Sequence, residues 1–534
     1  MIHDTVNQHI QNALPIYLLN LQDMNLVRRS TVWQYLYHDV AEYIQAHMDG
    51  IIKDMDPDRR YSYVTQGSQV LQDLTVKTKT WITEKTAYAI FSHRWLDMGE
   101  LTFQDISKFK SLSVPGFRML INHKSDRKML KGTDILDQVN DYSPENPENC
   151  EDRLKLLEVM KKLCEDMSDV ETRDCQDFVK LVEFFNISLK YGCNYVWFDS
   201  GCIDKSSSTE LEESIRSMFN WYRNSKICIV HLANTTYLLD LGRDTWFTRG
   251  WTLQELLSPK RIKFFRKSWQ HITCGSTDND KHLDLKNTNP WKIISSTTKI
   301  PLPTLLDFIP GINHARDALV WVSKRKTTCI KDIAYRLIGV LGIPLSIAYS
   351  ERNMAFHRLQ VEILQHTHDM GLFAWIGQPS AYNSMLAEGP QCFSESSLQS
   401  HLQPLSMAKS QTLTNMFRVF DPTYAFTNYG LHIPLSIYTV HSWEVCHAPS
   451  FRLRLRADKL GNIMTQFIMK SPNLEGYDHL KIAILADLLT MQSSTCIAIL
   501  LGSKGGRYKR IPTKEHIILS RCTNLTAPEM IFIE

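Results

Sequence analysis

Glu255 is the residue whose type and surroundings best suit chemistry on a bound substrate. It lies in 251–257, a segment predicted to be a short helix. At about 100° per residue, the three leucines of this segment share one face, and Glu255 points nearly opposite, alongside Trp251. An indole wall beside a carboxylate suits a nucleotide, because the carboxylate can bind ribose hydroxyls and stabilise the positive charge that develops when an N-glycosidic bond breaks. The alternative is a structural glutamate paired with Arg249 or Arg94.

Three further polar residues, Ser92, His93 and Arg94, directly follow the apolar run 88–91, which is predicted to be a buried strand. The guanidinium of Arg94 can hold a phosphate or a carboxylate through paired hydrogen bonds. Its alternative role is to tie a loop to a nearby carboxylate. His93 is either a proton donor or a hydrogen-bonded structural residue, and its position at a strand end favours the structural role.

Asp199 follows a second predicted strand, 195–198, and either caps the next loop or orients a ligand. Asp204 and Lys205 lie in that loop, and we interpret both as turn residues. Trp197 is large and lies within the strand, so we interpret it as part of the core.

Alternating strands and helices position these residues. Such alternation implies parallel pairing through crossover connections, hence a doubly wound, mostly parallel α/β sheet with large helical insertions. Ligands of such sheets bind at the carboxyl ends of the strands, where the polar residues above lie. The predicted strands are 88–91, 195–198, 227–232 and 261–265, and the helices between them are 178–189, 211–222 and 251–257.

The whole sequence divides into four segments by pattern. Their predicted bounds are a mainly helical N-terminal extension at 1–85, the α/β domain at 86–270, a helical region at 271–380, and a β-rich domain of short apolar runs and turn residues at 381–534. The most loop-like part of the α/β domain's charged insertion is 143–149.

Composition excludes several classes of protein. The net charge of +3 on 534 residues gives no basis for nucleic-acid binding. No apolar run reaches the roughly 18 residues needed to cross a bilayer, and the polar N-terminus lacks a secretory signal. The 12 cysteines form no metal-binding spacing, so we expect reduced thiols, a cytoplasmic protein, and neither metal nor resident cofactor. Glycine-rich phosphate loops and serine-hydrolase elbows are missing.

Three sequence motifs resemble the signature of the fungal heterokaryon-incompatibility (HET) family. They occur in the family's order and cover about a third of the chain. The first is Tyr88-Ala-Ile-Phe-Ser-His-Arg-Trp95 with 100–105, the second is 195–206 with 213–222, and the third is 246–257. Segments 327–335, 355–360 and 371–375 resemble the helical region that often follows HET domains, although 349–352 has Ser and Arg where glycines are expected.

HET domains are in turn similar to TIR domains, some of which cleave the nicotinamide–ribose bond of NAD. That resemblance implies a TIR/flavodoxin-like fold, with Glu255 as the catalytic carboxylate and NAD as a possible substrate. The expected substrate-binding residues are Ser92, His93, Arg94, Trp95, Asp199, Trp251 and Thr252. The sequence departs from TIR enzymes at Thr252, where they have Cys, and at Arg249, where many have Ser.

The resemblance implies an effector that triggers programmed cell death when copies associate, or when a partner incompatibility or sensor protein binds. The alternative is a non-catalytic signalling module that acts through protein contacts. The two hypotheses differ at Glu255, since only an enzyme requires its carboxylate. The β-rich C-terminal segment is a candidate recognition and control domain.

Overall fold

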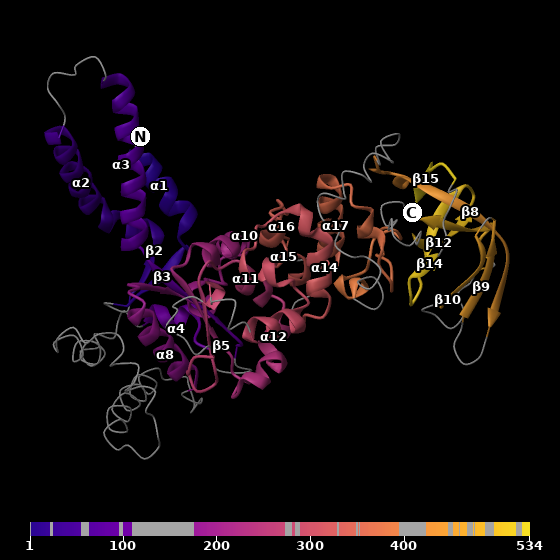
Figure 1. Ribbon diagram of the computed structural model, residues 1–534, viewed down its shortest axis with the longest axis horizontal. Coiled ribbons are helices and arrows are strands. Elements are labelled where there is room, and N and C mark those ends of the chain that lie inside the picture. Colours follow the sequence, from indigo (N-terminus) through magenta and orange to yellow (C-terminus); the bar gives the residue numbers. More distant parts are fainter. Residues whose placement is uncertain are drawn as a thin grey trace. The chain divides into compact units, whose positions relative to one another are not determined.

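The chain forms two compact units, Met1–Phe308 and Ile309–Glu534, in the computed structural model (Figure 1). The predicted insertion loop at 143–149 lies outside the described residues. The structure describes residues 2–21, 25–54, 63–95, 100–108, 176–272, 280–282, 289–327, 331–348, 351, 353–394, 423–446, 452–458, 460–466, 474, 476–485, 496–519 and 526–534.

A six-stranded mixed sheet forms the centre of the first unit, in the order β2-β1-β4-β3-β5-β6. The four strands β4, β3, β5 and β6 pair in parallel, and β1 and β2 extend the β4 edge with antiparallel pairs. All four predicted strands are therefore present. The strands are β1 (Tyr17–Asn20), β2 (Leu26–Arg28), β3 (Tyr88–His93), β4 (Tyr195–Trp197), β5 (Ile227–His231) and β6 (Ile262–Phe265).

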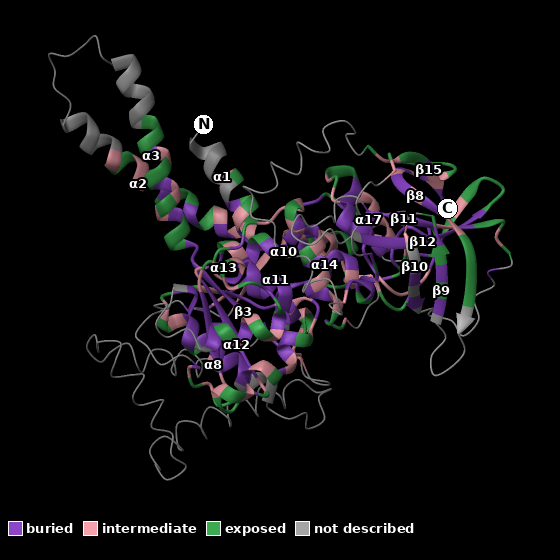
Figure 2. Cartoon of the chain, turned by 45° about the vertical axis from the view of Figure 1, so that its right-hand side comes forward, coloured by how far each residue is buried: buried purple, intermediate pink, exposed green. Residues whose placement is uncertain are grey.

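Every residue of β3, β5 and β6 is buried, as expected for parallel strands covered on both faces (Figure 2). The helices of this unit are α1 (Ile2–Ala13), α2 (Arg29–Asp54), α3 (Tyr63–Lys85), α4 (Phe103–Lys108), α8 (Gln176–Lys190), α9 (Asp199–Cys202), α10 (Ser208–Asn224), α11 (Thr252–Leu257), α12 (Asn289–Thr298) and α13 (Leu302–Leu306), with 3₁₀ turns η3 (Leu238–Arg243), η4 (Thr245–Thr248) and η5 (Asp280–His282).

Helices α8 and α10 cover opposite faces of the sheet (Figure 2). On the α8 face, the ring of Phe91 stacks on that of Phe184, with centroids 4.5 Å apart. On the α10 face, the Tyr88 hydroxyl donates to the carbonyl of Trp221 over 2.5 Å. Trp197 is fully buried, and its ring meets that of Trp221, so its predicted core position is confirmed.

Local sequence signals explain where these two helices begin and end. The side chain of Ser207 accepts from the backbone N–H of Glu210, which caps the start of α10. Beyond the end of α8, Gly192 has φ +67°, a left-handed conformation that favours glycine.

The second unit contains helices followed by strands, and the predicted β-rich C-terminal region is confirmed. Its helices are α14 (Ala315–Ser323), α15 (Asp332–Tyr335), α16 (Ile338–Leu341) and α17 (Met354–His366), with turns η7 (Ile312–His314), η8 (Met370–Phe373) and η9 (Pro390–Phe393). Its strands are β7 (Ala425–Thr427), β8 (Gly430–Cys446), β9 (Arg452–Ala457), β10 (Gly461–Gln466), β11 (His479–Ile484), β12 (Cys496–Lys504), β13 (Arg507–Ile511), β14 (Ile517–Leu519) and β15 (Glu529–Ile533).

Strand β8 is long enough to join two parts of this sheet. Its first half pairs with β15 and its middle with β11, so β8, β11, β12, β13 and β15 form a closed ring. Six of its last seven residues pair with β9, with an irregularity between Val440 and Ser442, and β9 pairs with β10. Outside the closed ring, β10 is an edge strand of the described sheet.

Two of the downstream motifs meet the divergent segment 349–352 inside the second unit. The carboxylate of Glu351 accepts from the Tyr335 hydroxyl at 2.5 Å and from Arg358 at 2.6 Å. Tyr335 and Arg358 belong to the motifs 327–335 and 355–360. Of the divergent segment 349–352, Glu351 is the residue that the structure describes, and it joins the helices on either side.

Candidate functional site

Glu255 and Ser92 meet at the carboxyl end of β3, although 163 residues separate them in the sequence. The Ser92 hydroxyl donates to Oε2 of Glu255 over 2.5 Å and accepts from the indole N–H of Trp246 over 2.9 Å. Glu255 is 7% exposed and Ser92 is 1% exposed. A carboxylate in this setting has a fixed orientation and little hydration, which strengthens its interaction with a nearby positive charge.

The loop after β5 positions Trp246 through the buried carboxylate of Asp244. One oxygen of Asp244 accepts from the backbone N–H of Trp246, and the other accepts from Asn234 and Thr235, each bond being 2.9 Å. Asp244 therefore joins the start of the loop to the 3₁₀ turn that carries Trp246. Sequence reasoning missed Asp244, and it placed Trp246 in a motif without giving it a role.

Helix α11 and the residue before it include three of the predicted site residues. The Thr252 hydroxyl lies 2.7 Å from the carbonyl of Trp246 and 2.9 Å from that of Arg249, so it stabilises the backbone before the helix. Trp251 is half-buried and immediately precedes α11. Glu255 lies within the helix, in which every residue is buried. The structure thus places the Thr252 hydroxyl against backbone carbonyls.

His93 points to the opposite face of the sheet from Ser92, because side chains alternate along a strand. Its Nε2 lies 3.4 Å from Glu100, whose other oxygen accepts from Lys180 over 2.6 Å. All three side chains are at most 10% exposed. His93 is therefore part of a buried charged group on the α8 face, separate from Glu255 and Ser92.

The adjacent end of β5 adds an aromatic pair on this α8 face. His231 is the register partner of His93, and its ring stacks on Trp269 with centroids 4.3 Å apart. Burial lowers the pKa of His231 to about 4. Trp269 has φ +62°, an uncommon conformation for a large side chain, and its ring also stacks with Phe91. The sequence carried no signal that identified this pair.

Trp95 and Asp199 join the loops after β3 and β4. The Trp95 indole N–H donates to both Asp199 oxygens, at 3.1 and 3.0 Å. The Lys205 ammonium lies over the Trp95 ring, 3.9 Å from its centroid, and burial lowers the pKa of Lys205. Asp204 instead accepts from Ser206 within its own turn, as predicted for a turn residue.

Two arginines lie at the same edge of the sheet. The guanidinium of Arg249 donates to the carbonyl of His93 over 2.7 Å and lies 5.9 Å from the centre of the Trp95 ring. Arg94 makes a long, 3.5 Å hydrogen bond to the hydroxyl of Thr245. The predicted residues therefore form three groups at one edge: Ser92 with Glu255, Trp95 with Asp199, and His93 on the other face.

Among the described residues, no group of three or more His, Cys, Asp or Glu side chains is arranged to hold a metal ion. Nor does any described helix combine the length and apolarity needed to cross a membrane.

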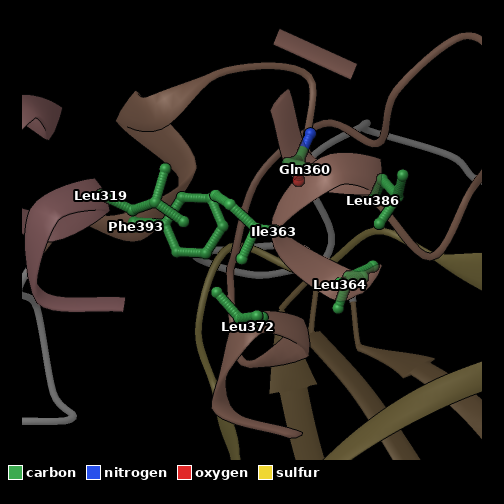
Figure 3. A pocket seen from close by; sticks show the side chains of 7 residues that line it. All are labelled: Leu319, Gln360, Ile363, Leu364, Leu372, Leu386 and Phe393. Atoms are coloured by element: carbon green, nitrogen blue, oxygen red, sulfur yellow. The ribbon is translucent and has the colours of Figure 1, made fainter. Parts of the chain in front are cut away.

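In the second unit, a cavity of about 10 Å³ lies between α14 and α17 (Figure 3). It has room for about one water molecule and is lined mostly by leucines, so it is no candidate substrate site.

Together, the fold and these groups define the first unit as a mixed α/β domain with a buried carboxylate at the carboxyl edge of its parallel strands. Residues 158–240 match the family described as "Heterokaryon incompatibility protein (HET)". Over 184 residues the chain is 35% identical to the "Vegetative incompatibility protein HET-E-1" of Podospora anserina. The chain carries a HET domain. The match covers 32% of this chain and only 13% of that relative, and no solved structure matches.

Proposed function

We propose that this chain acts in heterokaryon incompatibility, as an effector of programmed cell death in the cytoplasm. In this proposal its HET domain cleaves the nicotinamide–ribose bond of NAD or a related nucleotide. Cleavage begins when copies associate or when a partner incompatibility or sensor protein binds. Support for the biological role comes from the HET match and from the incompatibility relative.

The order of the parallel strands supports a TIR-like, doubly wound domain. The first of these strands, β3, lies between the second, β4, and the third, β5, and β6 follows at the edge. Flavodoxin-like sheets have this order, and they bind ligands where the direction of winding changes. Here that place is the carboxyl end of β3 and β5, beside Ser92 and Glu255.

One observation carries the enzymatic proposal: the meeting of Glu255 with the end of β3. When the bond between nicotinamide and ribose breaks, its electron pair leaves with the nicotinamide and positive charge develops on the ribose. A fixed carboxylate stabilises that charge. Water then adds to the ribose carbon and releases a proton. Ser92 and Trp246 orient the carboxylate for this role.

The test is NAD loss and nicotinamide release by purified, concentrated protein, wild type beside Glu255→Gln. The amide keeps the size of the side chain and an oxygen that can accept from Ser92, so the fold should be retained. We expect cleavage by the wild type and a loss of at least 100-fold in the variant. A folded Gln variant that cleaves NAD at the wild-type rate would exclude catalysis by Glu255.

The burial of Glu255 favours a second candidate function. A carboxylate that is 7% exposed and bonded to Ser92 also fits a structural role within a signalling module. Such a module would trigger death through protein contacts alone. If neither the wild type nor Glu255→Gln cleaves NAD, and both kill equally when expressed in fungal cells, this non-catalytic function is the correct one.

A further inference from the structure

Gln254, in helix α11, is a buried polar side chain that takes no part in the Glu255 site. It directly precedes Glu255 in the chain and is 0% exposed. Within the part of the chain that the structure describes, neither its amide oxygen nor its amide nitrogen has a hydrogen-bond partner. The other polar side chains of α11 are bonded, since Thr252 reaches two backbone carbonyls and Glu255 accepts from Ser92. The position of α11 therefore satisfies both of these side chains but not Gln254.

A buried amide without a partner raises the free energy of the conformation that buries it. Such an amide has lost its hydrogen bonds to water and has gained none within the protein. An apolar side chain of the same length and flexibility, such as methionine, carries no such cost. Any displacement of α11 that brings the amide to water or to a polar group also removes the cost. Gln254 therefore favours movement of the helix away from the position seen in the structure.

Helix α11 is short, so it can move as a unit when its polar contacts exchange. Its six residues are too few to be stable without tertiary contacts. Glu255 attaches its middle to β3, and Lys281 donates to the carbonyl of Leu257 at its end, over 3.1 Å. One turn after Gln254, the hydroxyl of Ser258 donates to a carbonyl of α10. Because residues four apart share a helix face, the unsatisfied amide lies on the side of α11 that meets α10.

The position of α11 in the structure, its closed position, also covers the carboxylate that the proposed reaction requires. Glu255 is 7% exposed and bonded to Ser92, so a ribose cannot reach it until the helix or its surroundings move. We propose that α11 is a conformational switch, in which buried Gln254 destabilises the closed position and lowers the cost of exposing Glu255 when the active assembly forms. The inference rests on the proposed function for its substrate, and it adds how the carboxylate becomes accessible.

The test is hydrogen exchange of the full chain without any ligand, wild type beside Gln254→Met. The reporter is the backbone N–H of Ser258, which donates to the carbonyl of residue 254 over 2.9 Å and exchanges when α11 moves. The reference is the N–H of Cys228 in β5, which donates to the carbonyl of Arg261 over 2.9 Å. We expect Gln254→Met to slow exchange at Ser258 by about tenfold and to leave Cys228 unchanged. Gln72→Met, at an exposed position of α3, is the matched control and should change neither rate.

Methionine keeps the length of the side chain and a high helix propensity, so the fold should be retained, which circular dichroism checks. Gln254→Leu is the second variant and should slow exchange at Ser258 in the same way. Exchange that is unchanged or faster in both variants, or loss of folding in both, would overturn the proposal, because the amide would then not destabilise the closed position.

NAD cleavage by the same proteins separates this proposal from the enzymatic one. If both hold, Gln254→Met should cleave NAD about tenfold more slowly than wild type, since its closed position is more stable. Slower exchange at Ser258 with cleavage at the wild-type rate would show that α11 does not control access to Glu255 and would overturn the proposal. Slower exchange with no cleavage by either protein supports the switch and removes the enzymatic function, whereas equal exchange and equal cleavage do the reverse.

Discussion

Ser92 has two buried partners that each depend on its hydroxyl. Its oxygen accepts from Trp246, and its proton bonds to Glu255. We expect Ser92→Ala to lower the free energy of unfolding of the first unit by about 2–4 kcal/mol, because a buried N–H and a buried carboxylate oxygen each lose a partner. Thermal unfolding measures this. Ser296→Ala, at an exposed position, should cost less than about 0.5 kcal/mol, and an equal effect of the two changes would contradict the argument.

The site is divided between two faces of the sheet, and only part of this division could be predicted from single residues in the sequence. That Ser92 and His93 face opposite ways follows from the alternation of side chains along any strand. Which face carries which partner does not follow, since Glu255 and Glu100 belong to elements whose docking depends on the whole fold. Glu255 was predicted from its helix, but its bond to Ser92 required the tertiary structure.

Strands β3 to β6 were predictable because each is a compact apolar run between helical patterns. Strands β1 and β2 were missed because they have four and three residues, and β1 is held by pairing with distant β4. Salt bridges from Arg28 to Glu210 and from Arg29 to Glu213 add to this attachment. The first residues of the chain therefore complete the sheet, and no local pattern indicates this.

His231, at the end of β5, should make the stability of the first unit depend on pH. Burial lowers the pKa of His231 from 6.5 to about 4, so the unfolded state binds more protons between these values. Stability should therefore fall as pH drops from 6.5 towards 4, by roughly 3 kcal/mol for this residue. We expect His231→Phe, which keeps the ring stacked on Trp269, to reduce the difference in unfolding midpoint between pH 7 and pH 5. An unchanged difference in the Phe variant would show that His231 is not its source.

At the scale of the whole molecule, the chain divides after Phe308, and the predicted boundary at 380/381 lies within the second unit. One physical connection across that boundary is Arg510 of β13. Its buried guanidinium donates to the carbonyls of Phe373 and Trp375, at 2.7 and 2.6 Å, and lies 3.6 Å from the centre of the Trp375 ring. A sequence pattern could not pair residues 135 positions apart.

Replacement of Arg510 should therefore loosen the attachment of the helices to the strands within the second unit. We expect Arg510→Met to destabilise this unit by about 3–5 kcal/mol, since two buried carbonyls lose charged donors. Lys509→Met, at an exposed position of the same strand, should have little effect. Hydrogen exchange measures the stability of the two units separately. Protection from exchange should fall in α14, α17 and β13 and stay unchanged in β3 and β5. Equal loss in β3 would mean that the two units unfold as one, and the division after Phe308 would then have no energetic counterpart.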